Sequence, residues 1–85
     1  EAPDIDLPGS FQPRIRLEQS VIEEGGINEI ARLVGTLARR HVSRGIADSE
    51  HQLLRFAKQS VTTEVAVSLS LPDAEAERMI DARLP

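Results

Sequence analysis

Cysteine, tryptophan and tyrosine are absent from this 85-residue sequence, and phenylalanine occurs only as Phe11 and Phe56. Without cysteine, the protein has no disulfide, no thiol nucleophile and no cysteine-rich zinc site. Because Phe, Trp and Tyr together make up 2% of the chain, the core has to be built from Leu, Ile, Val and Ala. That composition suits helices packed on helices better than a β-sandwich, and it predicts an all-α fold.

Long apolar runs are also lacking. No stretch approaches the length of a membrane span, and the N-terminus has neither the basic start nor the apolar run of a signal peptide. With 40% hydrophobic and 28% charged residues, the composition is that of a folded globular chain of one domain. We therefore expect a cytoplasmic protein without a membrane partner, whose small core gains stability from oligomerisation or from burial against a partner.

The chain lacks the basic surplus of a dedicated nucleic-acid-binding protein, because its net charge is −4. The charge is unevenly spread, and the segment 27–46 is basic, with four arginines against one glutamate. Arg32, Arg39 and Arg40 in this segment are candidate contacts for DNA phosphates or for an acidic partner. The alternative interpretation is a solvated polar face that has no partner.

The first residues are rich in helix breakers. Three prolines fall within residues 1–13 and interrupt any regular element, and a Gly-Gly pair at 25–26 closes the segment that follows. Residues 14–18 alternate polar and apolar side chains, as a short strand does. We expect residues 1–24 to form a flexible or extended N-terminal arm and residues 25–85 to form the helical domain.

Helical periodicity is clearest between residues 27 and 44. Apolar side chains recur along one arc, which ends at Gly45, a residue typical of helix C-termini. A domain of this size leaves part of such an arc uncovered. We therefore predict a helix over residues 27–44 that pairs with a second copy. The residues predicted for that dimer interface are Ile30, Val34, Leu37 and His41.

Three shorter helices are expected in the remaining residues. The first covers residues 49–59, because Ser49 and Gln52 match a capping box and apolar residues follow at helical spacing. The other two cover residues 63–69 and 73–83. The whole chain is thus predicted to be a small helical bundle with a C-terminal unit of three helices and an N-terminal arm.

The last two of these helices carry a distinctive pattern at residues 63–80. Ala66 supplies the small residue that two crossing helices need, Leu71 fills the turn between them, and apolar residues four apart pin the second helix. This pattern resembles the helix-turn-helix of bacterial regulators, including the winged-helix type. The resemblance covers residues 50–84, and it implies a tri-helical unit that binds DNA.

The resemblance also implies a recognition helix at residues 73–83. The residues that would face the major groove are Ala74, Glu75, Arg78 and Ala82. Two positions depart from the family's pattern, because Ser70 stands where glycine is usual and Pro72 stands where a capping Ser or Thr is usual. The alternative interpretation is a structural helical hairpin that docks on a partner.

No catalytic, cofactor or metal site is expected. His41 and His51 are ten residues apart, without cysteine, and lack the spacing of metal ligands. No serine lies in a nucleophile motif, and no glycine-rich phosphate loop occurs. The chain is also short for enclosing a pocket, so no small-molecule substrate is expected.

Two functions compete for this sequence. The first is a non-enzymatic regulatory module of the helix-turn-helix type, which binds DNA as a dimer in the manner of a transcriptional regulator. The second is an acidic helical module for protein–protein interaction on a similar scaffold: an adaptor, a docking domain or an antagonist. The motif favours DNA as the partner, whereas the acidic net charge favours a protein.

Overall fold

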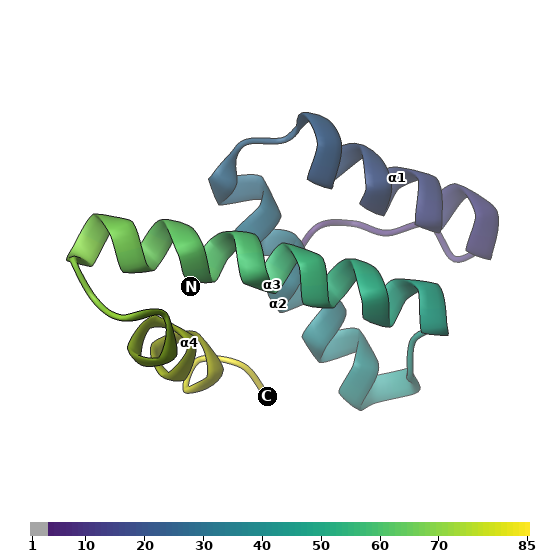
Figure 1. Ribbon diagram of the computed structural model, residues 1–85. Coiled ribbons are helices and arrows are strands. Elements are labelled where there is room, and N and C mark those ends of the chain that lie inside the picture. Colours follow the sequence, from purple (N-terminus) through teal and green to yellow (C-terminus); the bar gives the residue numbers. More distant parts are fainter. Residues whose placement is uncertain (1–3) are drawn as a thin grey trace.

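The computed structural model describes residues 4–85, which contain four α-helices and no strand. The helices are α1 (Phe11–Glu24), α2 (Ile27–Arg44), α3 (Asp48–Leu69) and α4 (Asp73–Asp81). Figure 1 shows α3 running through the molecule, with α1 beside its N-terminal half and α4 beside its C-terminal end. The predicted all-α fold is confirmed.

The helix α1 stands where the prolines and the alternating pattern predict an extended arm. Pro13 is the third residue of α1, where its missing N–H costs nothing because the first turn of a helix has no backbone acceptor for its amides. The arm predicted over residues 11–24 and the strand predicted at residues 14–18 are therefore wrong. The buried side chains of α1 have helical spacing: Arg14, Ile15, Glu18 and Val21.

Residues 4–10, ahead of α1, have no regular secondary structure but are attached to the domain. The Ile5 amide donates a hydrogen bond of 2.9 Å to Thr36 Oγ1 in α2, and the side chains of Ile5 and Leu7 pack against the core. The expected flexible arm is thus corrected for these residues. Residues 1–3 of that predicted arm lie outside the described part of the chain.

The helix α2 covers the residues over which the sequence is periodic, and its apolar arc forms the centre of the core. Leu33 and Leu37 cluster with Val21 of α1. Val34 clusters with Ala57 of α3. Because α2 lies between two helices, both flanks of its arc are buried, and a core forms without large aromatic side chains.

The helix α3 is continuous where the sequence predicts two helices. Ser60 and Thr62 lie at the expected break, and their hydroxyls donate to backbone carbonyls four residues earlier, at 3.2 Å to Phe56 and 2.8 Å to Lys58. Such bonds satisfy Ser and Thr inside a helix. The predicted break at residues 60–62 is therefore wrong, and one long helix replaces the first two helices of the expected tri-helical unit.

The start of α3 also differs from the prediction. Glu50 Oε1, rather than Gln52, accepts a hydrogen bond from a backbone amide before the helix, that of Ala47 at 2.9 Å. The capping box predicted with Ser49 is therefore wrong by two positions. The reason is that Glu50 is fixed in place by a buried ion pair, which no local pattern reveals.

A tight turn joins α3 to α4. Ser70 adopts the left-handed conformation, with φ 54° and ψ 48°, and the Leu71 amide donates to the Ala66 carbonyl at 2.9 Å. Ala66 and Ala76 are both buried, which lets the two helices approach closely. The last helix ends at Asp81, two residues before its predicted end.

Candidate functional site

Two of the four residues predicted for a dimer interface are covered inside the chain. Val34 and Leu37 are 3% and 0% exposed, because α1 and α3 pack over the arc of α2 that the sequence suggests is uncovered. Ile30 is half-buried and His41 is exposed. The assignment of Val34 and Leu37 to a dimer interface is therefore wrong, whereas dimer formation itself stays a prediction.

The residues predicted to read DNA are all exposed, on α4 or directly after it: Ala74, Glu75, Arg78 and Ala82. Arg78 Nη2 lies 2.6 Å from Glu75 Oε2, so the cation of this face is paired with a carboxylate one turn earlier. Both partners are largely exposed, and such a pair adds little stability. Three further acids in α4 make this surface negative.

A basic hollow of about 280 Å³ lies between the second half of α2 and the segment that precedes α1. Residues 30–47 hold four arginines and no acid, and cations are favoured near the C-terminal end of a helix. We call it the arginine hollow, after the three α2 residues that line it: Arg39, Arg40 and Arg44. Arg32, also predicted as a contact, is half-buried elsewhere on α2 and does not line the hollow.

The three arginines of the hollow differ in what they contact. Arg39 pairs with Asp4. The Nε of Arg40 is buried, and it donates no hydrogen bond to any of the described residues. Arg44 is exposed. Because buried donors are nearly always satisfied, an unsatisfied Nε beside two further guanidinium groups suits the binding of an anion.

Basic groups continue from the hollow across the corner between α2 and α3. The rings of His41 and His51 meet edge to face, with centroids 4.7 Å apart and an interplanar angle of 80°. Arg44 lies one turn after His41, Arg55 lies one turn after His51, and both arginines are exposed. Within residues 4–85, no group of three or more His, Cys, Asp or Glu is placed to hold a metal ion.

A buried cluster of charges fastens α1 to α3. Arg14 donates to both carboxylate oxygens of Glu50, from Nε at 2.8 Å and from Nη2 at 3.1 Å, and Nη1 donates to the Gly9 carbonyl at 2.9 Å. Glu18, one turn after Arg14 on α1, is completely buried beside this pair. We call Arg14, Glu18 and Glu50 the carboxylate cluster.

The two carboxyl groups of this cluster titrate in opposite directions. Burial raises the pKa of Glu18 to about 8, and the neighbouring Glu50 adds to the shift. Burial acts on Glu50 in the same sense, but hydrogen bonds from Arg14, Glu18 and the Ala47 amide outweigh it and lower the pKa to about 2. Within residues 4–85, neither Glu18 oxygen accepts a hydrogen bond, so no such bond favours the charged form of this carboxyl.

The carboxylate cluster and the arginine hollow are electrostatic neighbours. Arg40, which lines the hollow, lowers the pKa of Glu18 and so opposes the effect of burial. The raised pKa favours the protonated form of Glu18 at neutral pH, and this form has no charge to offset that of Arg40. The spacing of Arg14 and Glu18, four residues apart, is the one sequence signal for this cluster, and the alternating pattern around it hides that signal.

A comparison with known protein families matches the chain to the C-terminal domain of CarD over residues 1–81. The chain belongs to the CarD C-terminal domain family. The match extends across all four helices, whereas the helix-turn-helix resemblance covers little more than α3 and α4. CarD C-terminal domains are transcription-associated regulatory domains, and the family is one of interaction modules rather than enzymes.

This CarD C-terminal domain therefore has a regulatory role associated with transcription. The transcriptional part of the prediction is thereby confirmed at the level of the family. Among the helices of residues 4–85, none has the length and apolar content needed to cross a bilayer.

Proposed function

We propose that this CarD C-terminal domain acts in transcription by binding the phosphate backbone of DNA at the arginine hollow. The observation that carries the proposal is the convergence of three arginines on one hollow: Arg39, Arg40 and Arg44. Phosphate oxygens are the acceptors that guanidinium groups match best.

The expected binding mode follows from the small number of cations. Arg40 and Arg44 are available for phosphates, whereas the Arg39 guanidinium has to exchange Asp4 for an external anion. Contacts of this kind fix the position of a protein on the duplex but do not read sequence. With a net charge of −4, the domain is expected to bind weakly, without sequence preference and with strong sensitivity to salt.

The second candidate is the outer face of α4, which stays a prediction from the helix-turn-helix resemblance. Arg78 would read a guanine edge there, with Glu75 beside it on a cytosine amino group. The ion pair between these two residues and the three other acids of α4 count against this face, because a negative surface repels phosphates. We therefore favour the arginine hollow.

Fluorescence anisotropy with a short labelled duplex of mixed sequence tests the proposal. The affinity of the wild type is expected to fall steeply between about 50 and 200 mM salt. Arg40→Gln and Arg44→Gln are each expected to weaken binding for all sequences and to reduce the salt slope by about 1. Arg78→Gln is the matched control on α4 and is expected to bind like the wild type.

Two results would contradict the proposal. Absence of binding at low salt removes DNA as a direct partner. A loss of affinity in Arg78→Gln, together with unchanged affinity in Arg40→Gln and Arg44→Gln, moves the contact to α4 and restores the recognition-helix prediction.

A further inference from the structure

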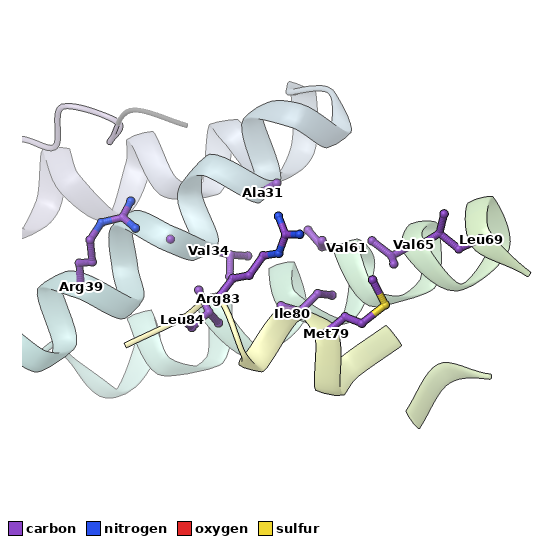
Figure 2. A pocket seen from close by; sticks show the side chains of 11 residues that line it. Ala31, Val34, Arg39, Val61, Val65, Leu69, Met79, Ile80, Arg83 and Leu84 are labelled. Carbon is purple, nitrogen blue, oxygen red and sulfur yellow. The ribbon is translucent and has the colours of Figure 1, made fainter. Parts of the chain in front are cut away.

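An apolar groove of about 450 Å³ opens between α2, α3 and α4, on residues that the arginine hollow, apart from Arg39, does not use. The helix α4 contributes Met79 and Ile80, and α2 contributes the small residues Ala31 and Gly35. Figure 2 shows the residues that α3 lines up along the groove: Val61, Val65 and Leu69. Its volume lies in the range of sites that bind a ligand or a peptide anchor, roughly 300–1,000 Å³.

The groove stays open because the helix that borders it is short. The helix α4 has nine residues, whereas α3 has 22, and it leaves Leu69 of α3 and its own Met79 exposed. At the other end, the Arg39 guanidinium lies over Gly35, since a Cβ on this glycine would stand 2.9 Å from Arg39 Nη2. Figure 2 shows Arg39 and Leu69 at opposite ends of the groove.

The charge of the groove is positive. Of its eleven lining residues, two are arginine and none is acidic. Arg39 pairs with Asp4. Arg83, just after α4, has no ion pair with any of the described residues, and Figure 2 shows its side chain reaching across toward α2 and α3. A carboxylate placed at this point gains a charged hydrogen bond.

We propose that this groove docks a short amphipathic helix from a protein partner, one that carries a carboxylate beside its apolar face. Val61 and Leu69 are eight residues apart, so the α3 side of the groove is about 12 Å long at 1.5 Å per residue. That length accommodates two turns of a partner helix, with apolar anchors at i and i+4. Helices that bind grooves of this kind present such an apolar face.

A second copy of the chain fits this groove less well than an acidic helix. In a symmetric dimer the same patch faces itself, and each copy would bring two arginines and no acid to the contact. Like charges at such a contact oppose association. The docking proposal can be tested apart from the proposed DNA contact, because Arg83 lines the groove alone and Arg39 is the residue that the two sites share.

Three synthetic helical peptides provide the test, each titrated by calorimetry against the full chain. The first has leucines at i, i+4 and i+7 with flanking glutamates, the second has lysines in place of the glutamates, and the third has serines in place of the leucines. The protein variants are Met79→Glu and Arg83→Glu in the groove. The matched control is Val67→Glu, an α3 residue that is 73% exposed and lies outside the groove.

The acidic peptide is expected to bind the wild type about tenfold more tightly than the basic one, and the serine peptide is expected not to bind. Arg83→Glu should bind the basic peptide more tightly than the acidic one. For the acidic peptide, Met79→Glu should weaken binding at least about tenfold, and Val67→Glu should change it less than about twofold. Circular dichroism checks that each variant is folded. If Met79→Glu does not fold, the result for Arg83→Glu decides the test.

The proposal is overturned if the acidic and basic peptides bind equally, or if Val67→Glu weakens binding as much as Met79→Glu. It is also overturned if the wild type sediments as a dimer and Met79→Glu sediments as a monomer, because a second copy of the chain then occupies the groove. Arg40→Gln separates the two proposals, because it is expected to lose DNA binding and to keep peptide binding.

Discussion

The two ends of α3 are held to the domain by different physics. At its N-terminal end, Glu50 is locked to Arg14 of α1 by two buried hydrogen bonds, with the buried carboxyl of Glu18 beside them. At its C-terminal end, the small residues Ala66 and Ala76 let α3 and α4 approach closely. The first attachment is directional, and the second is a matter of shape and apolar area.

The two attachments differ in the free energy that they cost and in the surface that they leave uncovered. A buried ion pair is costly to form and very costly to break, but it fixes one arrangement of α1 and α3. Close packing of small residues needs no such compensation, but a short helix covers little area and leaves the apolar groove beside it. The apolar end of α3 therefore borders an open groove, whereas its charged end is closed by the ion pair.

The largest effect is expected from removing one partner of the ion pair. Arg14→Met leaves the Glu50 carboxylate buried without its guanidinium, and we expect the free energy of unfolding to fall by about 3–5 kcal/mol. Urea denaturation measures this loss. The double variant Arg14→Met/Glu50→Leu removes both charges and should regain most of it. A loss below about 1 kcal/mol in the single variant would show that the pair behaves like a surface salt bridge.

At the apolar end, overpacking is expected to have a smaller effect. Ala66→Leu places a large side chain at the contact between α3 and α4 and should cost about 1–3 kcal/mol. Ala82→Leu, on an exposed residue after α4, should change the stability by no more than about 0.5 kcal/mol. The same denaturation curves compare the two. Equal losses at both positions would mean that α4 packs on α3 through a different face.

The carboxylate cluster should also make stability depend on pH. Glu18 has an ordinary pKa of 4.5 and a pKa of about 8 in the folded protein, so between these values the folded state keeps a proton that the unfolded chain releases. Its contribution is complete below about pH 4.5 and is lost as the pH rises through about 8. Glu50 acts in the opposite sense, since its contribution is present above pH 4.5 and is lost as the pH falls toward about 2.

Glu18→Gln isolates the contribution of Glu18 to the pH dependence of stability, because an amide does not titrate. The wild type is expected to lose stability between about pH 5 and pH 8 with a slope of at most about 1.4 kcal/mol per pH unit, and the variant is expected to lack this slope. Urea titrations across this range provide the measurement. If the stability of the two proteins changes with pH in the same way, a group other than Glu18 causes the loss of stability toward pH 8.

The smallest effect is expected on the outer face of α4. Arg78→Ala removes an exposed ion pair with Glu75, and the stability should change by less than about 0.5 kcal/mol. Thermal unfolding at low and high salt is sufficient to detect a larger change. A clear loss of stability would mean that this pair helps to hold α4, which would make the two ends of α3 more alike than the structure indicates.

The sequence predicts what depends on neighbours along the chain. The all-α class follows from the composition, and Ser70, which stands where the turn pattern usually has glycine, is left-handed in the structure. The helix α1 is missed because Pro13 is harmful in most positions of a helix and harmless in the first turn. The continuity of α3 is missed because the hydroxyls of Ser60 and Thr62 donate hydrogen bonds to backbone carbonyls within the helix.

The sites depend on contacts between distant residues, which local patterns do not encode. The sequence identifies Arg39 and Arg40 as candidate contacts, but the hollow forms only when the segment around Asp4 folds against α2. The pairing of Arg14 with Glu50 spans 36 residues. The contact between the two histidine rings depends on the corner between α2 and α3, so a spacing of ten residues conceals it.

Chemical-shift mapping with a short DNA duplex is the sharpest test of the proposed contact, because it locates the contact residue by residue. During a titration at low salt, amide shifts are expected to concentrate on residues 36–44 of α2 and on residues 4–7, with residues 73–82 unchanged. Raising the salt is expected to reverse these shifts. Shifts centred on residues 73–82, with α2 unchanged, would contradict a contact at the arginine hollow and make α4 the DNA-binding helix.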